Sequence, residues 1–142
     1  MTTYLDTSAL VPLLLDEPGS AQYHLLLDRP GRVTSSMITL VEASAALSRA
    51  QRAGRLSARA FDAAQRSLDD LWTQITPLPL TDPIVRFASL VAHRYQLRGY
   101  DAMQCASALA ISDEPDFVVA SGDHGLLTAW DRLGLYTVDI AG

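Results

Sequence analysis

Residues 117–138 read FVVASGDHGLLTAWDRLGLYTV, which is a strand pattern, a helix pattern and a second strand pattern in succession. We expect the strands at 117–120 and 135–138, where short apolar runs occur, and the helix from Gly125 to Arg132. Strands that alternate with helices are joined by right-handed crossovers and form parallel sheets. This stretch therefore favours an α/β fold.

The rest of the sequence shows the same alternation. Strands are expected at 4–5 and 33–35, and an extended segment at 75–80, which Pro77 and Pro79 confine to a sheet edge because proline cannot donate to a strand ladder. Further helices are expected at 8–15, 21–27, 39–52, 57–72, 83–96 and 102–111. The pattern predicts one domain over residues 1–142, a three-layer α/β/α fold with a mostly parallel central sheet covered on both faces.

The charged residues exclude several kinds of enzyme. The 142 residues carry a formal net charge of −5, and all 11 cations are arginines, since the chain has no lysine. P-loop NTPases, Schiff-base enzymes and receiver-type phosphorelay domains each need a lysine amine at the site. The acidic balance argues against broad electrostatic binding to nucleic acid, but it is compatible with a local acidic pocket that holds a cation.

We expect a soluble protein of the cytoplasm with no membrane partner. The sequence lacks the basic start and apolar run of a signal peptide, and no apolar stretch approaches the roughly 20 residues of a membrane span. The single cysteine, Cys105, excludes an intrachain disulfide and a thiolate metal cluster, which favours a reducing compartment. Its apolar helix indicates core packing.

Four acidic residues fall at positions where chemistry is expected. Asp6 and Asp123 follow predicted strands, whose carboxyl ends border the ligand crevice of a parallel sheet. Glu42 lies in the first turn of the helix from Thr39, and Asp101 lies at the start of a buried helix. Both are on apolar helix faces, where a carboxylate without a partner is unfavourable. Four converging carboxylates would raise one another's pKa unless a divalent cation neutralised them. Oxygen ligands without histidine or cysteine favour Mg²⁺ or Mn²⁺.

Each acid also has a structural interpretation as a helix cap. The spacing of a capping box occurs twice, in Asp101 with Gln104 and in Thr39 with Glu42. Asp123 could cap the helix that follows it, and Asp6 the helix from Ser8. Singly, each cap is the better interpretation, whereas four acids gathered at one sheet edge favour a cation site. Asp139, after the last strand, and His124, beside Asp123, stay open as further members of that edge.

Four segments carry a resemblance to a known family: YLDTSAL (4–10), TLVEASAAL (39–47), LRGYDAMQCASAL (97–109) and VASGDHGLL (119–127). In order and spacing they resemble the acidic motifs of PIN-domain ribonucleases, most closely the VapC-type toxins of type II toxin–antitoxin systems. The resemblance implies a PIN-like domain in which Asp6, Glu42, Asp101 and Asp123 are the catalytic and metal-binding acids. It also implies that Ser8 and Ser121 are supporting polar groups near the metal.

The same resemblance implies a function and partners. The protein is expected to be a Mg²⁺-dependent endoribonuclease toxin, with Mn²⁺ as a plausible substitute, that forms a homodimer and hydrolyses phosphodiester bonds of RNA. A cognate antitoxin protein is expected to inhibit it by laying a segment in an apolar groove near the active site. The alternative is a non-catalytic PIN-like module that binds RNA or protein. An aspartyl phosphotransferase is disfavoured, because Ser8 stands where a second aspartate is typical.

The arginines are the candidates for contacts with phosphate, since the chain has no lysine. Arg94 and Arg98 lie one helical turn apart just before Asp101, where they either hold the substrate backbone or form a solvated helix face. A second group surrounds the turn at Gly54 and could guide RNA, meet an acidic partner segment or simply solvate the hairpin: Arg49, Arg52, Arg55 and Arg59.

Overall fold

The computed structural model describes residues 1–15, 28 and 30–142. A five-stranded, all-parallel sheet forms its centre, in the order β3-β2-β1-β4-β5. The strands are β1 (Thr2–Leu5), β2 (Arg32–Ser36), β3 (Thr76–Leu78), β4 (Phe117–Ser121) and β5 (Tyr136–Asp139). The expected helix at 21–27 lies outside the described residues. The parallel α/β prediction is confirmed, and β3 is the edge strand that its prolines predict.

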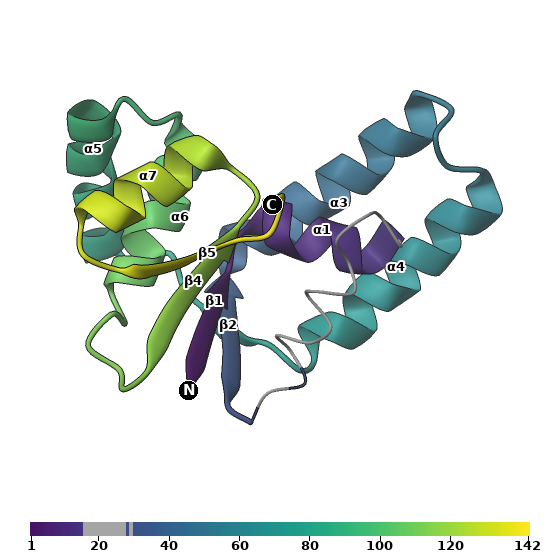
Figure 1. Ribbon diagram of the computed structural model, residues 1–142. Helices are drawn as coiled ribbons and strands as arrows, with labels where there is room; N and C mark the ends of the chain where they lie inside the picture. The colour runs from purple at the N-terminus through teal and green to yellow at the C-terminus, as the bar shows by residue number, and fades with distance from the viewer. Residues whose placement is uncertain (16–27, 29) are drawn as a thin grey trace.

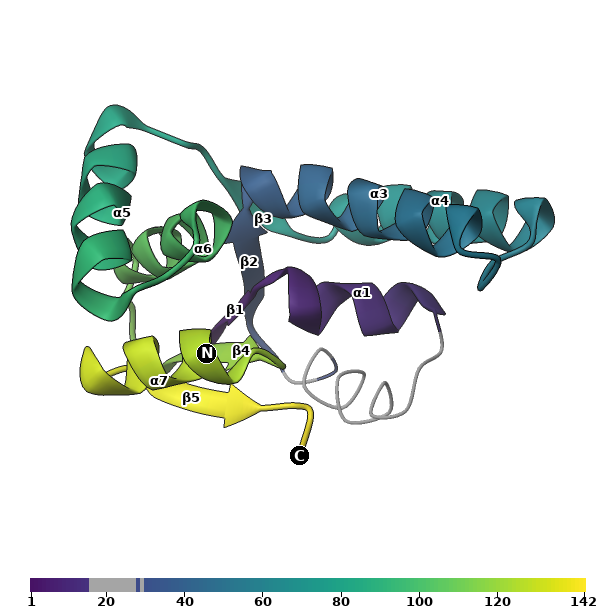
Figure 2. The same ribbon diagram turned by 90° about the horizontal axis from the view of Figure 1, so that it is seen from above.

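Helices cover both faces of the sheet, which makes three layers (Figures 1 and 2). One face carries α5 (Asp82–Tyr95), α6 (Gly99–Leu109) and α7 (His124–Arg132). The other carries α1 (Thr7–Leu15) and the long hairpin of α3 (Met37–Arg52) and α4 (Ala58–Trp72). No helix within the described ranges is long and apolar enough to cross a membrane.

Successive residues of β1 pack into core clusters on opposite faces of the sheet. Tyr4 packs with α5, α6 and α7, where its ring meets Trp130 edge-to-face at a centroid distance of 5.8 Å. Leu5 points to the opposite face, among Ala9 of α1 and Ala120 of β4. Cys105 is fully buried beside Tyr4, and burial raises the pKa of its thiol to about 12. The core role expected of this cysteine is confirmed.

The strand order places a topological switch point at β1. The chain runs from β1 outward through β2 to β3, then crosses back to β4 on the other side of β1 and continues to β5. Connections therefore leave the carboxyl ends of β1 and β4 toward opposite faces of the sheet, which opens a crevice there. Asp6 and Asp123 lie in these two connections.

Two helices, α3 and α6, begin two or three residues earlier than the sequence predicts. α3 begins at Met37, because the Ser36 hydroxyl accepts a hydrogen bond from the Ile38 N–H and caps the helix. Thr39 is therefore inside the helix, and Glu42 lies in its second turn instead of its first. α6 begins at Gly99 after Arg98, so Asp101 is its third residue. Both predicted capping boxes are wrong, since neither Thr39 nor Asp101 occupies a cap position.

Candidate active site

Asp6 is the buried centre of the acidic edge, with only 4% of its surface exposed. Its Oδ1 accepts hydrogen bonds from the Ser8 hydroxyl at 2.8 Å and the Ala9 N–H at 3.0 Å, and its Oδ2 accepts one from the Ser121 hydroxyl at 2.9 Å. Burial raises the pKa of Asp6 to about 7 despite these hydrogen bonds, which lower it. Asp6 therefore caps α1 and is a desolvated acid as well.

The two serines lie where the sequence analysis expects them, against Asp6. Their hydroxyl oxygens are 3.1 Å apart. Ser8 also accepts a hydrogen bond from the Gly122 N–H, and Ser121 accepts one from the Asp123 N–H. The loops that follow β1 and β4 are thus joined through side chains, and this fixes the distance between their two acids.

Glu42 reaches the same edge from α3. Its Oε1 accepts hydrogen bonds from the Thr7 hydroxyl at 2.8 Å and the Gln104 amide nitrogen at 2.9 Å. Sequence reasoning assigned Gln104 to a capping box and missed its contact with Glu42. A single amide among the alanines of a buried helix was the available signal.

Asp101 is half-buried on α6. Burial raises the pKa of its carboxyl group, and the negative charges of Asp123 and Glu42 raise it further, while the positive charge of Arg98 lowers it. Two of the other predicted site acids, Asp123 and Glu42, therefore lie within electrostatic range of Asp101. Such mutual repulsion is typical of a site that binds a cation.

Asp123 has both of the roles considered for it. It is the N-cap of α7, because its Oδ1 accepts a hydrogen bond from the Leu126 N–H at 3.0 Å. Its charge also raises the pKa of Asp6 and of Asp101. His124 and Asp139 instead pair with each other, with 3.2 Å between Nε2 and Oδ2.

The donor set fits a hard divalent cation, since carboxylate and hydroxyl oxygens are the ligands that Mg²⁺ and Mn²⁺ prefer. As the side chains stand, no three acidic, histidine or cysteine residues of the described chain are close enough to one point to chelate an ion. Asp123 thus acts electrostatically on Asp6 and Asp101, and Glu42 acts on Asp101, without three of these groups meeting at one point. By their chemistry, the residues that could hold a cation are Asp6, Glu42, Asp101 and Asp123.

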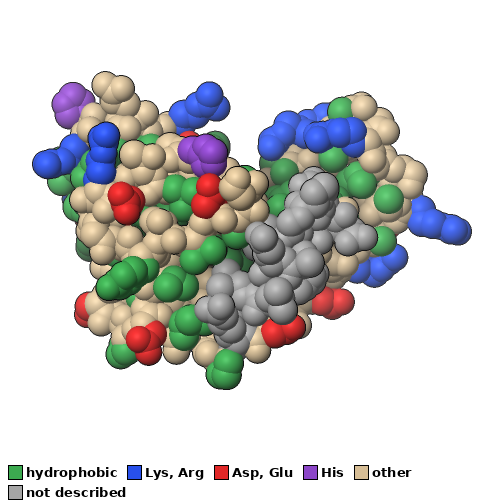
Figure 3. All heavy atoms as spheres, viewed as in Figure 1, with side chains coloured by type: hydrophobic (Ala, Val, Ile, Leu, Met, Phe, Trp, Pro, Cys, Tyr) green, Lys and Arg blue, Asp and Glu red, His purple; other side chains and the backbone are tan. Residues whose placement is uncertain are grey.

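The arginines occupy three different surroundings. Arg98 precedes α6 and affects the pKa of Asp101, whereas the Arg94 guanidinium lies over the Tyr95 ring, 5.9 Å from its centroid. Basic side chains gather at the end of the α3–α4 hairpin (Figure 3). One of them, Arg49, helps line a groove of about 240 Å³ that also contains Glu42 and the exposed ring of Tyr100.

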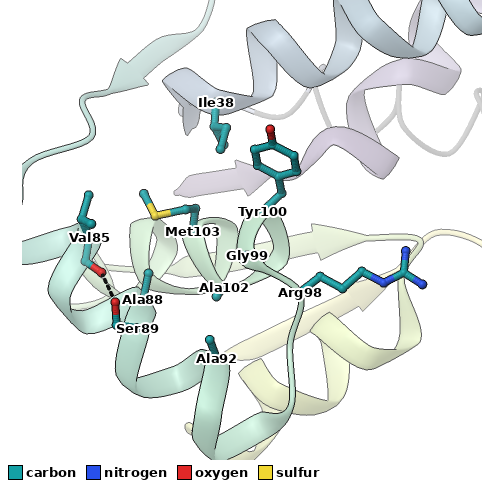
Figure 4. A pocket seen from close by; sticks show the side chains of 10 residues that line it. All are labelled: Ile38, Val85, Ala88, Ser89, Ala92, Arg98, Gly99, Tyr100, Ala102 and Met103. Atoms are coloured by element: carbon teal, nitrogen blue, oxygen red, sulfur yellow. Dashed lines mark hydrogen bonds between the residues drawn. The ribbon is translucent and has the colours of Figure 1, made fainter.

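An apolar pocket of about 450 Å³ lies beside this groove (Figure 4). Small side chains of α5 and α6 form its floor, including Ala88, Ala92 and Ala102, and Tyr100 separates it from Glu42. Val85 and Met103 stand at its rim. The pocket therefore begins one residue away from Asp101.

Acids at the carboxyl edge of an all-parallel sheet, reached from four different elements, define the class of the domain. The PIN domain family model matches residues 3–128. The chain belongs to the PIN domain family and, within it, to the VapC ribonucleases, since it is 38% identical to Ribonuclease VapC45 from Mycobacterium tuberculosis over 131 residues, which cover 92% of this chain and 90% of that protein. The resemblance carried by the four motifs is thereby confirmed.

Solved structures agree with the fold. PAE2754 from Pyrobaculum aerophilum superposes with a TM-score of 0.69 at 25% identity, covering 97% of this chain and 84% of that one. A toxin–antitoxin complex from Klebsiella pneumoniae gives a TM-score of 0.62 at 18% identity over 85% of this chain and 86% of that one.

Proposed function

We propose that this protein is a divalent-metal-dependent endoribonuclease that hydrolyses RNA phosphodiester bonds at the edge formed by Asp6, Glu42, Asp101 and Asp123. The observation that supports the proposal is that these four motif residues come from four separate elements and influence one another electrostatically, Asp123 acting on Asp6 and Asp101, and Glu42 on Asp101. A non-catalytic binding module would have no need of a desolvated acid such as Asp6.

The division of roles follows from the hydrogen bonds. A bound Mg²⁺ ion would lower the pKa of a water molecule and stabilise negative charge on the phosphate. Ser8 and Ser121 hold the Asp6 carboxylate in place, and Thr7 and Gln104 hold that of Glu42. Asp101, which is half-buried and has no described hydrogen-bond donor on its carboxylate, completes the set.

The groove beside Glu42 supports RNA as the substrate. Arg49 brings a guanidinium that suits a phosphate, and the ring of Tyr100, 64% exposed, offers a surface on which a base can stack. Arg98 lies near enough to Asp101 to lower the pKa of its carboxyl group, which supports it as a candidate for a contact with the scissile phosphate. Arg94 contacts Tyr95 and is therefore a weaker candidate for a contact with phosphate.

Purified protein, free of any partner, tests the proposal. It should cleave RNA with Mg²⁺ or Mn²⁺, lose activity in EDTA, and lose it again in Asp6→Asn and Asp101→Asn. Equal cleavage by wild type and Asp6→Asn would identify the activity as contamination. RNA binding without any cleavage in Mn²⁺ would favour the non-catalytic module instead.

We also propose a cognate antitoxin whose apolar segment occupies the pocket between α5 and α6. The pocket is apolar, adjoins Asp101 and lies next to the groove of Glu42, so its occupant would exclude RNA. The similar fold found in a toxin–antitoxin complex from Klebsiella pneumoniae supports an antitoxin as the partner. Co-purification with the product of a neighbouring small open reading frame, lost in Met103→Glu, tests the partner.

Membership of the family also leads us to expect that this protein forms a homodimer. Exposed apolar side chains on α3 and α5, such as Val41 and Leu90, offer surface that a second copy could cover. Light scattering after size exclusion would report a mass twice that of one chain. A single-chain mass at micromolar concentration would contradict it.

A further inference from the structure

We propose that Gln104 is a positioning residue that fixes the orientation of the Glu42 carboxylate, an inference that rests on the proposed function. Gln104 lies on α6, three residues after Asp101, and only 2% of its surface is exposed. A buried amide is costly unless all its polar atoms are paired. Both of its polar atoms are paired here, with side chains of three other segments.

The hydrogen bonds define which way the amide faces. The Gln104 Oε1 accepts a hydrogen bond from the Tyr4 hydroxyl at 2.5 Å. Its Nε2 donates to Glu42 Oε1 at 2.9 Å and to Thr39 Oγ1 at 2.8 Å, with Thr7 Oγ1 at 3.2 Å. An ionised carboxylate can only accept, so the amide nitrogen must face Glu42, and Tyr4 secures this orientation from the opposite side.

As a consequence, the two carboxylate oxygens of Glu42 differ in their hydrogen bonds. Oε1 accepts from both Thr7 and Gln104, whereas no residue in the described part of the chain donates to Oε2. The protein therefore holds one oxygen and leaves the other for the cation. Partners that orient a ligand in this way typically change metal affinity about 10- to 100-fold when they are removed.

The network also shows why packing alone does not explain this residue. Methionine is similar in length to glutamine and would fill the same space among the small side chains of α6 without a polar atom to satisfy. Gln104 instead links Tyr4 of β1 to Thr39 and Glu42 of α3. This link could either brace α6 against α3 or support the Glu42 carboxylate. The two roles predict different metal affinities for variants of Gln104.

A double-mutant cycle separates the two roles, with Mn²⁺ affinity measured by calorimetry. Gln104→Met should weaken Mn²⁺ binding about 10-fold or more when Glu42 is present. In the Glu42→Gln background the same change should alter the affinity less than twofold, because the carboxylate that Gln104 positions is gone. An equal loss in both backgrounds, or no loss in either, overturns the proposal and leaves the proposed function intact.

Two further variants separate a specific loss of Mn²⁺ affinity from a general destabilisation of the core. Cys105→Ala, on the same helix and fully buried, should lower the melting temperature without changing Mn²⁺ affinity. Tyr4→Phe keeps the ring but removes the hydroxyl that secures the amide, and should weaken Mn²⁺ binding by several fold. Unchanged affinity in Tyr4→Phe contradicts the proposal even if Gln104→Met does not fold. Wild-type protein that binds no Mn²⁺ would remove both the positioning role and the proposed function.

Discussion

The Ser121 hydroxyl donates a hydrogen bond to Asp6 Oδ2 at 2.9 Å and so joins the end of β4 to the acid that follows β1. These residues are far apart in sequence: Ser121 is the last residue of β4, and Asp6 directly follows the adjacent strand β1. The contact lowers the pKa of the Asp6 carboxyl group and opposes the effect of burial. It is the kind of support that keeps a carboxylate ionised inside a protein.

Removing this contact should destabilise the protein most when Asp6 is ionised. Ser121→Ala leaves a buried carboxylate without one of its donors, at a cost of about 1–3 kcal/mol at pH 8 in EDTA and less at pH 5. Urea denaturation at both pH values measures the difference. Ser112→Ala, in the turn after α6, is the control. An equal loss for Ser121→Ala at both pH values would count against the interpretation.

Metal-free protein should become less stable as the pH rises. The folded-state pKa of Asp6, about 7, lies above the ordinary value of 3.8, so the folded protein binds the proton more tightly than the unfolded chain. The stabilising contribution is complete below pH 3.8 and is lost as the pH rises through 7. Denaturation in EDTA between pH 5 and 8 should show this decline in wild type and a flatter profile in Asp6→Asn. Parallel profiles would contradict the assignment.

Mn²⁺ should stabilise the folded protein through the acidic edge. A ligand that binds only the folded state raises the melting temperature, and above the Kd the rise grows with the logarithm of the ligand concentration. Thermal denaturation with increasing Mn²⁺ should show a rise in wild type and a much smaller one in Asp101→Asn. Equal shifts in the two proteins would place the metal elsewhere.

Asp123 allows its structural and chemical roles to be separated. Serine is as good an N-cap as aspartate but carries no charge. Asp123→Ser should keep the stability of α7 and lose Mn²⁺ affinity, whereas Asp123→Ala should lose both, with about 0.5–2 kcal/mol of stability. Denaturation and calorimetry on the two variants test this. Full Mn²⁺ affinity in Asp123→Ser would show that Asp123 acts only as the N-cap of α7.

RNA binding should depend on the groove beside Glu42. In the inactive Asp6→Asn background, Tyr100→Ala should weaken binding of a labelled single-stranded RNA by about 1–3 kcal/mol, the usual contribution of one stacked base. Arg49→Ala should lower the salt dependence of binding by about one phosphate contact. Fluorescence anisotropy measures both. Tyr136→Ala, 79% exposed on β5, is the matched control, and equal losses in Tyr100→Ala and Tyr136→Ala would refute a groove-specific role.

The sequence predicts the sheet and two of the four acids for physical reasons that act locally. Strand patterns followed directly by Asp6 and Asp123 place these acids at the carboxyl edge, since all parallel strands end there. The cap roles of both residues were also readable, because a cap depends on hydrogen bonds to residues two or three positions away. Local spacing was enough for these features.

Contacts between elements could not be read in the same way. The spacing of Asp101 and Gln104 fits a capping box, but it equally places two side chains on one helix face, and the Tyr4 hydroxyl and the Glu42 carboxylate decide between these outcomes. Ser36 and Thr39 are both good caps by type, and only the backbone after β2 selects Ser36. Contacts with other elements thus decide between roles that the local sequence does not distinguish.

Glu42 and Asp123 each have one carboxylate oxygen bound to a protein donor and another to which no described residue donates. A side chain held in this way has already lost most of its rotational freedom before any ion arrives. An arriving cation therefore has less disorder to remove from these ligands, so affinity depends mainly on charge and desolvation. If the proposed metal site is correct, the chain would complete its fold first and bind its metal afterwards.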